Sequence, residues 1–95
     1  RHLRYLRTLG LQGQCAGDRA ANLSVAQSEA GADTLKRLSE VGERLVRDDG
    51  ARSVILGCTG MAKHREALEA ALGVAVIEPT QAATSVAIAA VQMRW

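Results

Sequence analysis

Cys58 is the residue of this chain whose type and setting best suit chemistry on a small molecule. It lies in the turn Gly57-Cys58-Thr59-Gly60, between an apolar run that ends at Leu56 and a stretch with helical periodicity. The first amides of a helix that follows a strand carry partial positive charge, which stabilises a thiolate and binds anionic oxygens. The turn therefore predicts a nucleophile or general base at Cys58, with Thr59 and Gly60 beside the substrate. The alternative is an inert small side chain at a strand end.

A second junction, Glu78-Pro79-Thr80-Gln81, follows the next apolar run. The carboxyl ends of parallel strands meet at one edge of a sheet, so both turns are expected to open onto one pocket. Thr80 is expected to cap the helix that follows it, and its hydroxyl is also a candidate to bind an anionic substrate. Glu78 is expected at the rim of this edge. His64 is expected on a solvated helix face.

Other chemistries fit the spacing less well. Two cysteines and two histidines, far apart in sequence, predict no metal site, and no cofactor fingerprint is present. A cysteine phosphatase needs an arginine after five intervening residues, whereas Arg65 follows Cys58 after six. Two alternatives stay open: a sulfur-transfer or redox enzyme that uses Cys58, and a non-catalytic fragment that binds small anions or a partner.

The elements that must position these residues follow from apolar periodicity. Helical patterns cover 2–9, 32–49, 61–72 and 80–91; buried strands are expected at 53–56 and 74–77, with a further short strand near 14–19. This alternation predicts an α/β fold, a three-layer α/β/α arrangement with a small parallel sheet, as one domain over residues 1–95. Ile88 lies off the apolar stripe of the last helix, which predicts burial on two sides or contact with a partner.

The composition of the chain argues against some classes of binding partner. The chain has 95 residues, of which 47% are hydrophobic and 23% charged, as in ordinary globular domains. A net charge of +2 and only two aromatic residues, Tyr5 and Trp95, argue against nucleic-acid binding. No apolar run reaches membrane-spanning length and no signal peptide is visible, so thiols without a disulfide and a cytoplasmic location are expected.

Two longer runs carry a family resemblance. The segments SVILGCTGMA (53–62) and LGVAVIEPTQAA (72–83) resemble the aspartate/glutamate/hydantoin racemase superfamily, and within it the hydantoin and allantoin racemases most. The resemblance covers most of residues 9–91. Glu78 stands where this family usually has Asp, and Ala75 where it usually has Pro, which bears on substrate identity more than on fold.

The resemblance implies a cofactor-independent racemase or epimerase of a hydantoin-like or allantoin-like small molecule. Such enzymes have two similar α/β domains around a cleft, and a cysteine from each domain faces the chiral carbon. Cys58 matches the second-domain cysteine, and Thr59 and Gly60 match its substrate-binding neighbours. Members are roughly twice this length. We therefore expect the C-terminal half of the fold, with the other cysteine supplied by a missing N-terminal domain or by a second copy in a homo-oligomer.

Overall fold

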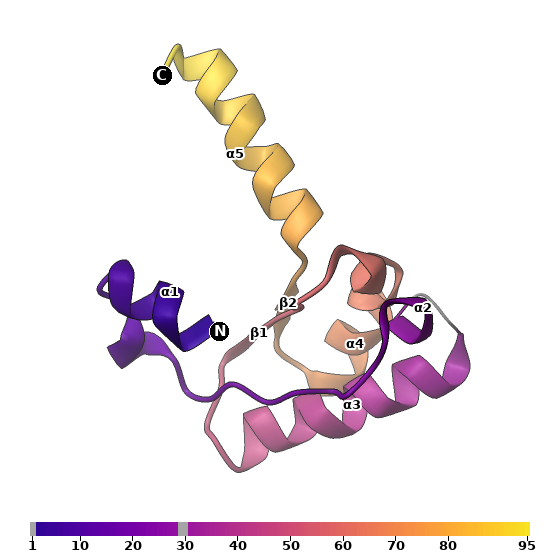
Figure 1. Ribbon diagram of the computed structural model, residues 1–95. Helices are drawn as coiled ribbons and strands as arrows, with labels where there is room; N and C mark the ends of the chain where they lie inside the picture. The colour runs from indigo at the N-terminus through magenta and orange to yellow at the C-terminus, as the bar shows by residue number, and fades with distance from the viewer. Residues whose placement is uncertain (1, 29–30) are drawn as a thin grey trace.

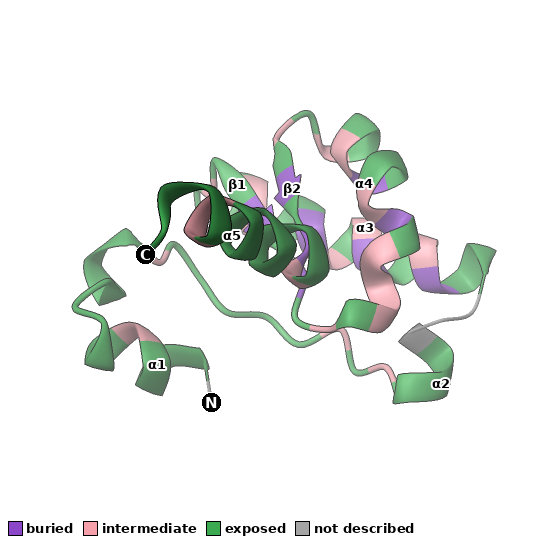
Figure 2. Ribbon diagram, turned by 90° about the horizontal axis from the view of Figure 1, so that it is seen from above, coloured by how far each residue is buried: buried purple, intermediate pink, exposed green. Residues whose placement is uncertain are grey.

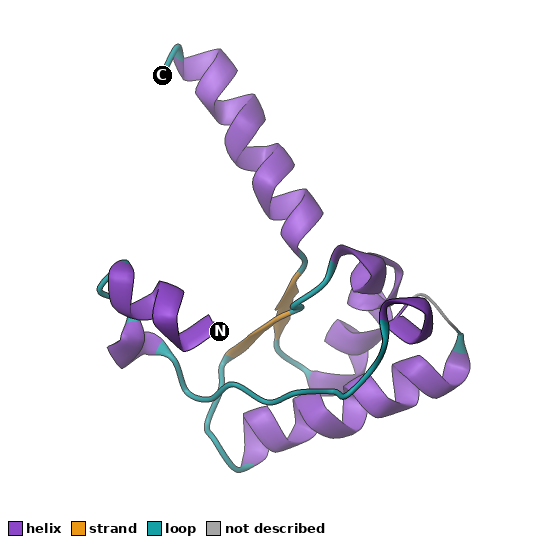
Figure 3. Ribbon diagram, viewed as in Figure 1, coloured by secondary structure: helices purple, strands orange, loops and turns teal. Residues whose placement is uncertain are grey.

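Helices precede, separate and follow two short strands in the computed structural model, which describes residues 2–28 and 31–95 (Figures 1 and 3). The elements are α1 (His2–Thr8), the 3-10 helix η1 (Gln12–Gln14), α2 (Val25–Ser28), α3 (Ala32–Arg47), β1 (Ser53–Ile55), the 3-10 helix η2 (Thr59–His64), α4 (Arg65–Leu72), β2 (Ala75–Ile77) and α5 (Pro79–Met93). The α/β class predicted from the sequence is confirmed.

The two strands form a parallel sheet. Ser53 pairs with Ala75 and Ile55 with Ile77, and η2 with α4 makes the crossover between the strands. Gly73 ends α4 with φ of 67°, a left-handed conformation that glycine adopts without strain. Both strands and the helices beside them lie where the apolar periodicity predicts them, within a few residues at each end.

One face of the sheet carries the core. The inward side chains of the strands meet those of α3 and α4, and the most enclosed is Leu68, which is 1% exposed. The α3–α4 contact is close because Gly42 is buried there. A Cβ at this position would lie 2.6 Å from Leu72 Cδ1. The core cluster consists of Leu38, Val54, Leu56, Leu68 and Val76.

Glu69 ties α4 to the sheet. Its Oε2 accepts a hydrogen bond from the backbone N–H of Val76 at 2.9 Å, and Arg65 Nη1 donates to the same oxygen at 3.3 Å. A carboxylate that accepts from both a backbone amide and a guanidinium is held in a fixed direction. These bonds fix the register between the last turns of α4 and the middle of β2.

The predicted strand near residues 14–19 is wrong. Gln12–Gln14 forms the short helix η1, and the chain then runs extended without pairing into the sheet. Side chains hold this segment instead: Arg19 forms a two-pronged ion pair with Asp49, with N–O distances of 2.6 and 2.8 Å. The Arg19 guanidinium holds the pKa of the Asp49 carboxyl below its usual range. Periodicity could not reveal an extended segment fixed by side chains.

The second face of the sheet is bare. Ile55 is 70% exposed and Ile77 is 41% exposed, so the described helices form a layer on one side only. Helix α5 leads away from the end of β2 and buries none of its residues, as its exposed colouring in Figure 2 shows. In residues 2–28 and 31–95, no helix combines the length and the apolar character needed to cross a membrane.

Candidate active site

The two strand-to-helix turns leave the sheet at the same edge. The N–H of Leu56 donates to the carbonyl of Ile77 at 2.9 Å, so the strands end side by side. The chain then enters η2 on one side and α5 on the other, and these two helices contact each other. The carboxyl ends of the two strands therefore lie together, whereas the depression found there is lined by residues of η2 and does not include Thr80.

Cys58 is the last extended residue before η2. Its φ of −148° and ψ of 137° are those of a strand, and its carbonyl accepts from the Met61 amide at 3.1 Å to begin the helix. The side chain is half-buried and forms no disulfide. This geometry presents the thiol at the strand end that is also the start of a helix, as the sequence predicts.

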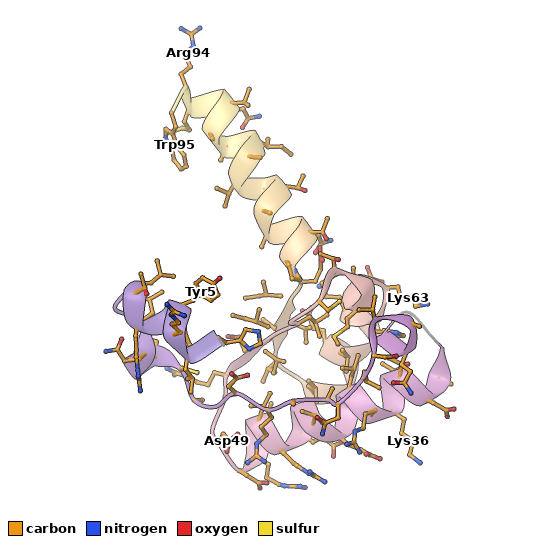
Figure 4. All side chains as sticks on the ribbon, in the orientation of Figure 1. Tyr5, Lys36, Asp49, Lys63, Arg94 and Trp95 are labelled. Carbon is orange, nitrogen blue, oxygen red and sulfur yellow. The ribbon has the colours of Figure 1, made fainter. Side chains whose placement is uncertain are left out.

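Thr59 and Gly60 line a shallow depression at the start of η2, together with Ala62 and Lys63. Lys63 is a further residue of this depression that the sequence argument did not place there. The available signal was a basic residue so soon after Cys58 in the sequence. Figure 4 shows its side chain at the outer surface of η2. The Lys63 ammonium, the Thr59 hydroxyl and the Gly60 backbone are together suited to bind an anionic or carbonyl oxygen.

Glu78 begins α5, which corrects the expectation that Thr80 caps this helix. Its carboxylate accepts from the backbone N–H of Thr80 at 2.9 Å and from that of Gln81, and Pro79 is the first helical residue. Glu78 is also buried, at 3% exposure, and does not lie on the rim. The Thr80 amide is thus already engaged, which leaves its exposed hydroxyl as the group available to a ligand.

Loss of the Glu78 carboxylate should unravel the start of α5. We expect Glu78→Gln to lower the free energy of unfolding by about 1–3 kcal/mol, because one amide loses its acceptor and a side-chain NH₂ group replaces it in a buried place. Glu78→Asp is the matched control, since Asp is a preferred helix cap and keeps both oxygens. Urea unfolding followed by circular dichroism at 222 nm measures both. Equal stability of the two variants would contradict this role.

His64 lies inside the protein, contrary to its predicted solvated position. It is 6% exposed, and within the part of the chain that the structure describes its Nε2 has no hydrogen-bond partner. The cause is its place on the apolar stripe of this helical stretch, three residues after Met61 and four before Leu68, so that it faces the core with them.

No metal site accompanies these residues. Among residues 2–28 and 31–95, no three His, Cys, Asp or Glu side chains are grouped so as to hold an ion. Cys15 lies after η1, with its thiol 3.5 Å from the carbonyl oxygen of Gly17, in the N-terminal extended segment. The candidate site therefore consists of Cys58 with the depression beside it and the Thr80 hydroxyl across the sheet edge.

Comparison with known proteins gives the family. The profile described as Asp/Glu/Hydantoin racemase matches residues 1–87. A hydantoin racemase of Paenarthrobacter aurescens is 38% identical over 89 residues, which are 92% of this chain and 38% of that protein. A hydantoin racemase of Pseudomonas sp. (strain NS671) is 34% identical over 70 residues, which are 73% of this chain and 28% of that protein. No solved structure gives a significant match.

The chain thus spans less than two fifths of the length of these relatives. The profile nevertheless runs through both strands, η2, α4 and most of α5, and so includes every element that builds the candidate site. The chain belongs to the Asp/Glu/hydantoin racemase family.

Proposed function

We propose that this chain contributes one half of a cofactor-independent racemase site for a hydantoin-like or allantoin-like substrate, with Cys58 as one of two thiol acid–base groups. The reaction class is supported by the relatives, which are named hydantoin racemases. The observation that carries the assignment to Cys58 is its position at the carboxyl end of β1, in the turn that begins η2. Thr59, Gly60 and Thr80 are proposed to bind the substrate.

The proposed step breaks the C–H bond at the chiral carbon. The Cys58 thiolate takes the proton, and the electron pair passes to the neighbouring carbonyl as an enolate. Donors at the start of η2, together with Lys63, lie in the depression where a developing oxyanion would be held. Returning the proton from Cys58 regenerates the same enantiomer. Inversion requires a second acid on the opposite face.

That second acid is proposed to come from a missing domain or from a partner chain. Cys15 lies in a different setting, after η1 and within a segment held by side chains, so it is not assigned this role. No cofactor takes part in the proposed chemistry, and a cytoplasmic location remains a prediction from the sequence. A single thiol on one face of the substrate should exchange the α-proton without inverting the chiral carbon. This is the activity predicted for the chain alone.

The test is exchange of the substrate α-proton in heavy water, followed by proton NMR. The substrates are the separate enantiomers of 5-substituted hydantoins, with allantoin, aspartate and glutamate beside them. We expect exchange above the buffer rate for one hydantoin enantiomer, with optical rotation decaying no faster than in buffer. Exchange at the buffer rate for every substrate would contradict an acid–base thiol in this chain. Exchange of both enantiomers with racemisation would show that a second acid is already present.

A further inference from the structure

His2 and Asp18 form a side-chain pair beside the turn that holds Cys58. The Nδ1 atom of His2 lies 3.1 Å from Asp18 Oδ1. The Cε1 atom of the same ring lies 3.6 Å from the point that a Cβ at Gly57 would occupy, and Gly57 directly precedes Cys58. The start of α1 and the extended segment after η1 therefore meet the carboxyl end of β1. Neither member of this pair has a role in the function proposed above.

The pair determines which nitrogen of the His2 ring is available to a ligand. An ionised carboxylate only accepts hydrogen bonds, so Nδ1 carries the proton that Asp18 binds. In the neutral imidazole, Nε2 then holds a lone pair, and it forms no hydrogen bond within the part of the chain that the structure describes. Nε2 lies 3.9 Å from the same Cβ point at Gly57. The result is an oriented hydrogen-bond acceptor at the strand end.

This acceptor and the Cys58 thiol approach the strand end from different sides. Successive residues of an extended chain direct their side chains to opposite faces, and burial alternates in this way from Val54 to Gly57. Gly57, where His2 lies, shares its side with the exposed Ile55. Cys58 is still extended and so directs its side chain the other way. A small ring bound beyond the strand end can therefore contact the thiol and the imidazole at different atoms.

We propose that His2 Nε2 accepts a hydrogen bond from the substrate N–H next to the chiral carbon, and thereby selects substrates that carry this N–H. The proposal rests on the function proposed above, which places the chiral carbon at Cys58 and the neighbouring carbonyl oxygen in the depression at the start of η2. In a hydantoin, the chiral carbon is bonded within the ring to that carbonyl carbon and to the nitrogen N1. The N1–H is thus the remaining polar ring group beside the reacting carbon, and it needs an acceptor.

The first test measures binding without reaction. The probe is 5,5-dimethylhydantoin, which has both ring N–H groups and no α-proton. We expect its addition to change the nitrogen chemical shift of His2 Nε2, because the lone pair becomes engaged. The derivative methylated at N1 should leave that shift unchanged, whereas the derivative methylated at N3 is the matched control and should change it. The chain has two histidines, so His2→Phe identifies the signal.

The outcomes of this titration separate His2 from the rest of the site. Shifts at the Thr59 and Gly60 amides without a shift at His2 would overturn the role of His2 and leave the substrate site standing. An equal response of His2 to the N1-methylated probe would also overturn it. No shift at any residue would count against both the acceptor and the proposed substrate site.

The second test uses α-proton exchange of a 5-substituted hydantoin. We expect His2→Phe to lower kcat/KM for exchange about 3–10-fold, the usual contribution of one hydrogen bond, with no change for the N1-methylated substrate. His2→Gln is the matched control, since its amide oxygen can accept the same bond. Asp18→Ala should give the same loss as His2→Phe, because the ring is no longer held. Since the His2 side chain is 60% exposed, these variants should fold. Equal losses on both substrates would make His2 a structural residue and overturn the proposal.

Discussion

Replacing Cys58 by serine is expected to reduce α-proton exchange to the buffer rate, a loss of at least about 100-fold, which is the usual contribution of a positioned acid–base group. Serine has almost the same shape but does not ionise as a thiol does, so the site keeps its geometry and loses its base. The NMR exchange rate of the preferred hydantoin enantiomer measures the effect. Cys58 is half-buried at the end of β1, outside the core cluster, so the variant should fold.

Cys15→Ser is the matched control for this experiment. Cys15 is also half-buried and forms no disulfide, but its thiol contacts the carbonyl of Gly17 in the N-terminal extended segment. Its exchange rate should equal that of the unchanged protein within error. Equal losses for the two variants would mean that thiols act nonspecifically, and no loss for Cys58→Ser would remove Cys58 from the site. Either result would leave the family membership standing, since that depends on the whole matched segment.

Truncation of Leu68 should be the most destabilising change in the core. Leu68 on α4 is 1% exposed and packs with Leu38, Val54 and Val76. We expect Leu68→Ala to lower the free energy of unfolding by about 2–5 kcal/mol, from lost burial and the cavity left behind. Domains are commonly stable by only about 5–15 kcal/mol, and this core is small. A large part of the population should therefore unfold in mild urea.

Urea unfolding followed by circular dichroism measures this change, with Leu9→Ala as the control. Leu9 is 67% exposed after α1, so its truncation should change stability by less than about 0.5 kcal/mol. A small effect of Leu68→Ala would show that α4 does not pack on the sheet as described. The proton-exchange activity of Leu68→Ala should fall in proportion to its unfolded fraction.

Sequence reasoning located the elements whose apolar periodicity lies within their own residues. The β-branched run from Ser53 and the stripe of α3 predict a strand and a helix without reference to the rest of the chain. The position of Cys58 between that strand and the next helical stretch followed from the same kind of pattern. The family resemblance drawn from two motifs agrees with the profile match.

The error at residues 14–19 lies where a contact with a distant residue decides the structure. Arg19 holds its segment through Asp49, thirty residues away, and no local period encodes that ion pair. Glu78 replaces Thr80 as the helix cap because its longer side chain turns back onto two amides. His64 is buried because it lies on the same stripe as Met61 and Leu68, a position that the helical spacing already indicated.

The hydrogen bond from Val76 to Glu69 also changes what the outer edge of β2 can offer to another strand. Ile77 directs its carbonyl toward the β1 side, so the alternation of a strand turns the N–H of Val76 to the outer edge. An outer edge with unpaired amides is a template on which another strand adds, and such additions grow into fibrils. Glu69 occupies the outward amide of this three-residue strand and places a carboxylate there. The amide that an added strand would use at this edge of β2 is therefore already engaged.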